Sequence, residues 1–166
     1  GSHMMDIATW ALDLDYPVSC EATGSPVKND TCPFWLDATW EHPANDWRPP
    51  VKVHWSDGGK KPEGIPENDR FKAVVIKGEK GYMVVDYGYR KIWYHNGDTA
   101  EEVPEIEKGT IRATEGPLTH YQEWVDGCKG GPTPLSNFDY ASKVIENNML
   151  ALTAYQSGKK LDWDAE

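Results

Sequence analysis

Apolar and polar side chains alternate along much of the first 95 residues of this chain. Apolar residues that recur at every second position predict strands with one buried face. Shorter apolar runs between turn residues also indicate strands. The expected strands cover 18–22, 34–40, 51–55, 73–76, 82–87 and 91–95. The segment from Lys77 to Gly81 is a hairpin loop between two of them.

A different period, with apolar residues three and four positions apart, predicts amphipathic helices. We expect helices at 5–14, at 118–128 and from Ser136 to Gly158. Their apolar stripes are Ile7, Trp10, Ala11 and Leu14; Tyr121, Trp124, Val125 and Cys128; and Ala141, Val144, Ile145, Asn148 and Leu152. Ser136 and Asp139 resemble a capping box. The acidic stretch 99–116 has no clear period and is interpreted as an extended connector.

The order of these elements predicts the fold class. A helix, then a run of strands, then two helices indicates an α+β fold with a mainly antiparallel, open β-sheet and helices on one face. The 166 residues suffice for a single domain, 1–166. The other sheet face, expected to carry Trp35, Thr39 and Tyr87 among charges, is available for a partner or for subunit pairing.

Composition narrows the functional classes. The net charge of −10 argues against a nucleic-acid partner. No signal peptide is visible, and no apolar run approaches the roughly 18 to 20 residues of a membrane span. Three widely spaced cysteines favour a reducing compartment, so we expect a cytoplasmic protein, with an exported form as the alternative. The eight Trp and eight Tyr side chains suit either of two roles: burial with their N–H or O–H group hydrogen-bonded, or stacking on sugar rings.

Four histidines are followed three residues later by an acid. Positions i and i+3 share one face of a helix but point to opposite faces of a strand. His54/Asp57 and His95/Asp98 lie at strand ends and are interpreted as accidental. His3/Asp6 and His120/Glu123 lie on expected helices and remain candidates.

Each candidate has a structural alternative. A neutral His3 at a helix start could accept a proton from a substrate hydroxyl, although Gly1 to Met4 also matches a common expression-tag remnant. His120 and Glu123 could bind substrate or form an intrahelical pair. Asn137 could cap the last helix or reach a pocket.

Several motifs are absent from the sequence. There is no G-x-G-x-x-G, no G-x-x-x-x-G-K-[ST] and no H-E-x-x-H, and no metal-ligand cluster stands out. We therefore expect no cofactor and no metal to be bound by this chain alone.

Two segments resemble the C-terminal half of the Gfo/Idh/MocA oxidoreductases. They are 5–24, which contains Asp6 and Trp10-Ala11-Leu12-Asp13-Leu14, and 123–164, which ends in Trp163-Asp164. Weaker similarity lies at 55–59 and 77–81. The resemblance implies that an N-terminal Rossmann domain, with its NAD or NADP and a Glu-Lys-Pro lysine, is not part of this sequence. The family's Asp four residues before the His would precede residue 1.

The resemblance also implies a function. The chain would be the substrate-binding and oligomerisation domain of an NAD(P)-dependent dehydrogenase that acts on the hydroxyl carbon of a sugar, polyol or similar small alcohol. His3 would be catalytic, with Asp6, Asn137 and His120 as substrate-binding candidates, and the open sheet face would form a homo-oligomer. The isolated chain would be inactive. The alternatives are a non-catalytic carbohydrate-binding module and a dimerisation domain.

Overall fold

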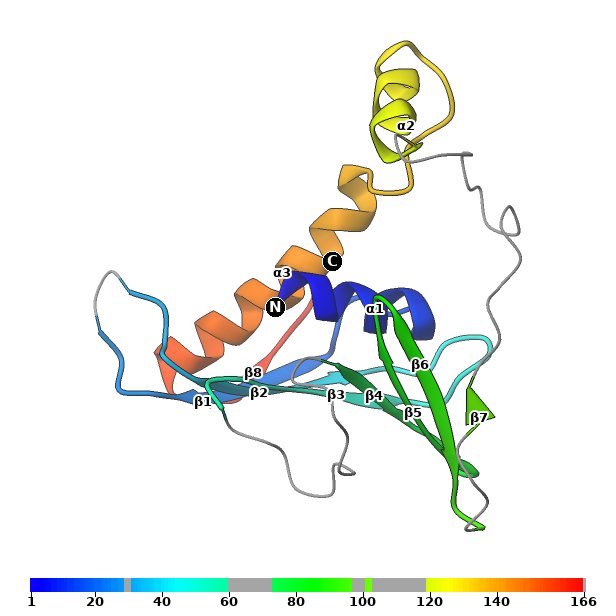
Figure 1. Cartoon of the computed structure of the whole chain (residues 1–166). Helices are drawn as coiled ribbons and strands as arrows, with labels where there is room; N and C mark the ends of the chain where they lie inside the picture. The colour runs from blue at the N-terminus through cyan, green and yellow to red at the C-terminus, as the bar shows by residue number, and fades with distance from the viewer. Residues whose placement is uncertain (29–30, 60–72, 97–100, 103–118, 166) are drawn as a thin grey trace.

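The computed structural model describes residues 1–28, 31–59, 73–96, 101–102 and 119–165. Its elements in chain order are α1 (Ser2–Leu12), β1 (Ser19–Gly24), β2 (Leu36–His42), β3 (Val51–Ser56), β4 (Val74–Lys77), β5 (Gly81–Asp86), β6 (Tyr89–Tyr94), β7 (Glu101–Glu102), α2 (Thr119–Cys128), α3 (Phe138–Ser157) and β8 (Leu161–Asp162). The predicted α+β class is confirmed: helices accompany open antiparallel sheets (Figure 1).

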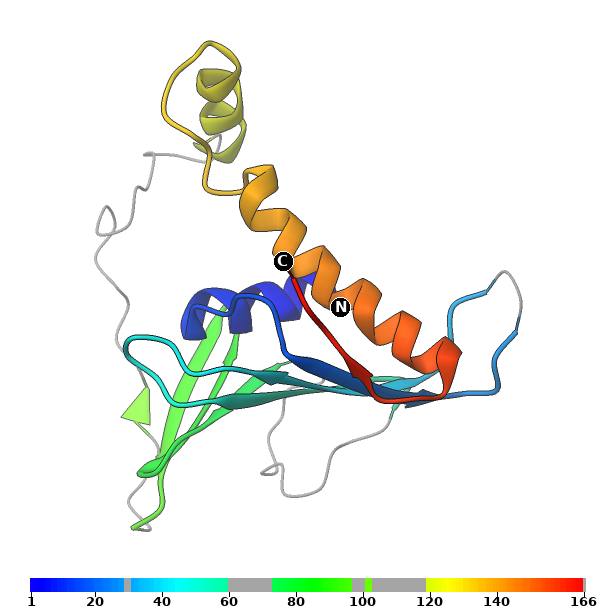
Figure 2. The ribbon, with the colours of Figure 1, turned by 180° about the vertical axis from the view of Figure 1, so that it is seen from behind.

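The strands form two sheets rather than one. The first sheet has the order β3-β2-β1-β8 and the second the order β4-β5-β6-β7, and every strand pair described is antiparallel. Helices α1 and α3 lie on the same side of the first sheet in both overall views (Figures 1 and 2). The last strand, β8, pairs with β1 after α3 has crossed the sheet (Figure 2).

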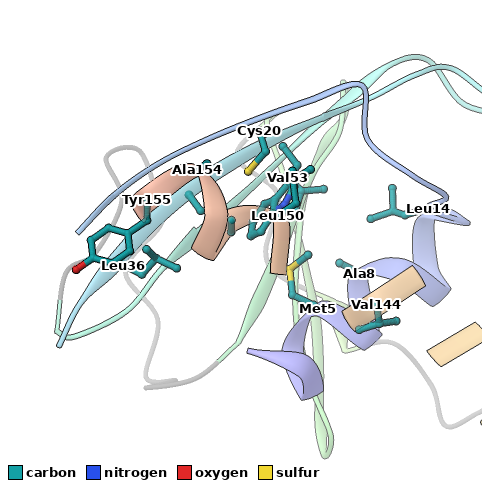
Figure 3. Close-up of a cluster of buried hydrophobic side chains, with 13 residues drawn as sticks. Met5, Ala8, Leu14, Cys20, Leu36, Val53, Val144, Leu150, Ala154 and Tyr155 are labelled. Atoms are coloured by element: carbon teal, nitrogen blue, oxygen red, sulfur yellow. The ribbon is translucent and has the colours of Figure 1, made fainter. Parts of the chain in front are cut away.

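The core fills the space between the first sheet and these two helices (Figure 3). Cys20, Trp40 and Val53 are neighbours across three strands, and all three are buried. Because side chains alternate along a strand, this row points to one face and meets Ala151 and Ala154 of α3. The indole Nε1 of Trp40 donates to the backbone oxygen of Asn147 at 2.9 Å. The sheet and α3 are thus joined by a buried hydrogen bond as well as by apolar contact.

The buried face of α3 differs from the predicted one. It consists of Val144, Asn147, Leu150, Ala151, Ala154 and Tyr155. Ile145, which was placed in the predicted stripe, is 47% exposed. A polar residue, Asn147, lies at the centre of the buried face, where its Nδ2 donates to the Lys143 oxygen. The predicted stripe passes through its neighbour Asn148 instead and is therefore rotated away from the buried face.

Helix α2 also differs from its prediction. The helix forms, but Tyr121 and Trp124 of the expected buried stripe are 62% and 64% exposed. In both overall views α2 lies beyond the N-terminal end of α3, away from the first sheet (Figures 1 and 2). No described surface covers this stripe, so the expectation that it is buried is wrong within the described residues.

The uncovered face of the first sheet is polar. Asp37, Thr39 and Glu41 of β2 alternate with the buried residues of that strand, and Lys52 and His54 of β3 lie opposite the last two. Glu41 pairs with Lys52 at 3.1 Å. Lys52, Ser19 and Lys160 together hold the pKa of Glu41 below its usual value. The expectation of a half-apolar open face is not met on these strands.

Candidate functional site

Helix α1 carries the first two candidate residues, His3 and Asp6. Its buried side, with Met5 and Ala8, packs on the core near Val144 of α3 (Figure 3). The helix ends early, because Asp13 takes a left-handed conformation with φ 47° and its backbone N–H bonds to the Thr9 oxygen. His3 and Asp6 are on the side of α1 that the core leaves open.

A buried arginine fixes the other end of α1. The Nε of Arg48, in the loop between β2 and β3, donates to the Leu12 oxygen at 2.6 Å. Its Nη1 donates to the oxygen of Pro43 at 2.8 Å and to that of Pro49 at 3.1 Å. Positive charge at a helix C-terminus also complements the helix dipole. Arg48 therefore holds the helix that presents His3 and Asp6.

Asp6 has a partner on α3. The hydroxyl of Tyr140 donates to Asp6 Oδ1 at 2.6 Å, which leaves Oδ2 as a second acceptor on the same carboxylate. Burial, followed by the hydrogen bond to Asp6 and the charge of that carboxylate, raises the pKa of the Tyr140 phenol. The phenol is thus neutral near pH 7 and acts as a donor. Sequence reasoning gave Tyr140 no role, because 134 positions separate it from Asp6.

His3 is exposed near the start of α1. Its ring meets the ring of Tyr87 edge-on, with centroids 6.2 Å apart. Tyr87 follows β5, and the tip of the β5–β6 hairpin approaches α1 in Figure 1. The imidazole is therefore accessible to a ligand, and one aromatic ring limits where such a ligand could lie.

A pocket of about 470 Å³ lies between α1 and α3. Its wall includes Trp10 of α1, Asp13 at the C-cap of that helix, and Asn137, Asp139 and Tyr140 at the start of α3. The ring of Tyr140 meets that of Trp10 edge-on, with centroids 6.0 Å apart. The same tyrosine therefore contacts Asp6 through its hydroxyl and Trp10 through its ring.

Asn137 is the N-cap of α3. Its Oδ1 accepts from the Tyr140 backbone N–H at 3.0 Å, and its Nδ2 donates to the Pro134 oxygen at 2.8 Å. The structural alternative for Asn137 is confirmed, and the capping residue is Asn137 rather than Ser136. Asn137 also lines the pocket. Its cap fixes the backbone of Tyr140, so the two roles are compatible.

His120 lies apart from the other candidates. It is exposed on α2, where its ring contacts that of Tyr121. The Glu123 Oε1 accepts from the Leu135 backbone N–H at 2.6 Å, so this carboxylate fastens the loop before α3. His120 does not line the pocket between α1 and α3. A substrate role for His120 remains a prediction without support from this geometry.

The side chain of His54 bonds within the first sheet. His54 Nε2 lies 3.3 Å from Asp37 Oδ1, and its Nδ1 lies 2.9 Å from Thr39 Oγ1. Asp57 instead accepts from the Leu36 backbone N–H at 2.6 Å and from the Trp55 indole at 3.2 Å. His54 and Asp57 therefore bond to different partners. The pair His95/Asp98 cannot be compared, because Asp98 lies outside the described residues.

The described residues contain no group of three or more His, Cys, Asp or Glu side chains that could hold a metal ion. No helix in the same part of the chain is both long and apolar enough to cross a membrane.

Comparison with known proteins locates the fold. No protein-family model matches the sequence, and no curated protein matches it. Solved structures do: a candidate oxidoreductase from Thermotoga maritima has 18% identity and a TM-score of 0.63 over 98% of this chain. An aldose-aldose oxidoreductase from Caulobacter crescentus has 14% identity and a TM-score of 0.61 over 98%. An NAD-binding protein from Listeria innocua has 13% identity and a TM-score of 0.61 over 98%.

The likeness covers only part of those proteins. This chain spans 45% of the Thermotoga maritima and Listeria innocua chains and 46% of the Caulobacter crescentus chain. At these identities the comparison shows the fold alone. The fold of this chain is that of about half of such an oxidoreductase.

Proposed function

We propose that this chain is the substrate-binding and oligomerisation domain of an NAD(P)-dependent oxidoreductase that acts on the hydroxyl carbon of a sugar or polyol. The observation that carries the proposal is the accessible His3–Asp6 pair on α1, with Asp6 held by Tyr140. The fold shared with half of several oxidoreductases supports it, as does the similarity of segments 5–24 and 123–164 to the Gfo/Idh/MocA family.

His3 and Asp6 would have different roles in the reaction. In the oxidation of an alcohol, the carbon loses a hydride to the nicotinamide and the hydroxyl loses a proton. The neutral imidazole of His3 would accept that proton as a general base. Asp6 would accept a hydrogen bond from a neighbouring hydroxyl through Oδ2, because Oδ1 is held by Tyr140. This would fix the reacting carbon beside His3.

The nicotinamide cofactor does not fit the described residues. A dinucleotide typically binds where parallel strands and a glycine-rich loop lead into a helix. Every strand pair described here is antiparallel, and no G-x-G-x-x-G occurs in the sequence. The cofactor would therefore be bound by another part of a longer protein.

Replacement of His3 tests the catalytic proposal. In a polypeptide that joins this chain to a nicotinamide-binding domain, His3→Ala should lower kcat by about 10²-fold or more through loss of a positioned base. Asp6→Asn should mainly raise KM. Ser2→Ala is the matched control: Ser2 is the neighbouring residue, and its hydroxyl bonds Asn148 instead. An unchanged rate in the His3 variant would remove His3 from the mechanism.

The open face of the first sheet is the proposed surface for subunit pairing. Its charged side chains, including Asp37, Glu41 and Lys52, carry both signs, so a second copy could meet it with opposite charges. Light scattering should find a dimer that weakens at high salt. Lys52→Glu should shift the equilibrium toward monomer, whereas Lys129→Glu, in the exposed turn after α2, should not. A wild-type monomer at all concentrations would contradict this part of the proposal.

A further inference from the structure

Three side chains, those of His3, Asp6 and Trp10, lie along one side of α1. An α-helix turns about 100° and rises about 1.5 Å per residue, so His3 and Trp10 lie about 20° apart around the axis and about 10 Å apart along it. Asp6 lies between them, and Asp13, the left-handed C-cap, follows the end of the helix. Contacts support this alignment, because Tyr140 touches both Asp6 and Trp10. A ligand that reacts at His3 could therefore extend along this side of α1 toward Trp10.

Trp10 is also part of the wall of the pocket between α1 and α3. Trp10 is 47% exposed, although its ring is held edge-on by Tyr140. Asp13, Asn137 and Asp139 surround it with oxygen acceptors and an amide. At about 470 Å³, the pocket falls within the usual range for small ligands. The proposed reaction at His3 and Asp6 does not use this pocket or the residues that line it.

The chemistry of the pocket selects a neutral, hydroxyl-rich ring. The indole of Trp10 offers an apolar face that fits the C–H face of a pyranose, and the carboxylates accept hydrogen bonds from its hydroxyls. A phosphate group would meet Asp13 and Asp139, whereas Lys143 is already paired with Asp15 at 3.0 Å. A purely apolar ligand would leave these carboxylates desolvated and without partners.

We propose that this pocket binds the second ring of a glycoside whose first ring lies at His3 and Asp6, so that the substrate is a disaccharide or larger glycoside rather than a single sugar. The inference rests on the proposed function. The spacing of about 10 Å between His3 and Trp10 suits two linked rings.

Titration calorimetry of this chain tests the inference. The probes are maltose, cellobiose and lactose, each compared with glucose and galactose. At least one disaccharide should bind about tenfold or more tightly than either monosaccharide. Trp10→Ala should remove that gain and leave monosaccharide binding unchanged, while Trp10→Phe should keep part of it. Trp47→Ala is the matched control, because Trp47 is 61% exposed but does not line the pocket.

The outcomes separate this inference from the proposed function. Asp6→Asn should weaken both classes of sugar, because the first ring lies there. Equal affinity for disaccharides and monosaccharides, with dependence on Asp6, would overturn the second-ring site alone. If the tighter binding of disaccharides depends on Trp10 but not on Asp6, the chain is a binding module and the proposed reaction at His3 and Asp6 is overturned. If no sugar binds, both proposals fail, and Trp10 is better explained by packing against another part of a longer chain.

Discussion

The hydroxyl of Tyr140 and the carboxylate of Asp6 form a 2.6 Å hydrogen bond between the start of α3 and the middle of α1. This bond joins residues from opposite ends of the chain at the edge of the candidate pocket. It fixes the orientation of one carboxylate oxygen and leaves the other open to a ligand. Tyr140 is therefore a positioning residue for Asp6 in the proposed site.

Tyr140→Phe should weaken sugar binding without unfolding the protein. Loss of a hydrogen bond to a charged group should cost about 1 to 3 kcal/mol of stability and free Asp6 to rotate. Calorimetry should show a drop in sugar affinity of about fivefold or more. Tyr155→Phe is the matched control, because the Tyr155 hydroxyl on the same helix donates to the Ser25 oxygen at 2.7 Å, away from the pocket. Equal loss of affinity in both variants would argue against a specific role for Tyr140.

Arg48→Lys should loosen α1. Lysine keeps the positive charge but lacks the guanidinium group that donates to the backbone oxygens of Leu12, Pro43 and Pro49. We expect a loss of about 2 kcal/mol in the free energy of unfolding. Amide exchange in α1 should also become faster. Urea unfolding and hydrogen exchange would measure the two effects.

The exposed Lys52 provides the contrast to Arg48. Its pair with Glu41 is solvated, so Lys52→Ala should change stability by less than about 1 kcal/mol. Comparable losses in the Arg48 and Lys52 variants would show that the buried hydrogen bonds of Arg48 do not fix α1.

Local periodicity predicts the elements well. The six strands from 18 to 95 and the three helices all form within a few residues of their expected positions. The predicted stop at Gly158 is confirmed by a left-handed conformation with φ 65°. These features depend on neighbours in sequence, which is why the sequence reveals them.

Long-range contacts were not predictable in the same way. Nothing near Asp6 indicates Tyr140, and nothing near His54 indicates that Asp37 rather than Asp57 is its partner. The predicted face of α3 ran through Asn148, whereas the buried polar residue is Asn147, whose backbone oxygen accepts from the Trp40 indole. The candidate residues on α1 were found from sequence, whereas the pocket beside them required the structure.

The chain alone should not bind a dinucleotide. Its described strand pairs are all antiparallel, and the sequence lacks the glycine fingerprint that brings a helix N-terminus to a pyrophosphate. Calorimetric titration with NAD⁺, NADH, NADP⁺ and NADPH should give no saturable heat. Binding of any of the four at micromolar concentration would contradict the assignment of the cofactor to another part of a longer protein.

Acid should destabilise the protein through His42. This side chain is 2% exposed, and neither ring nitrogen has a hydrogen-bond partner among the described residues. Burial, and then the positive charge of Arg48, lower the pKa of His42 from 6.5 to about 4, and Asp15 opposes this only in part. Because the folded-state pKa lies below the unfolded one, the contribution of neutral His42 is complete above about pH 6.5 and is lost as pH falls toward 4.

His42→Phe should flatten this dependence. Between pH 7.5 and pH 4.5, the wild-type chain should lose about 2 to 3 kcal/mol more unfolding free energy than the variant. Urea titrations at the two pH values give the difference directly. His120→Ala removes an exposed histidine and should leave the pH dependence unchanged. Since Arg48 also holds the end of α1, protonation of His42 beside it should loosen that helix first. Parallel stability curves for wild type and His42→Phe would mean that the charge of His42 does not differ between the folded and unfolded states.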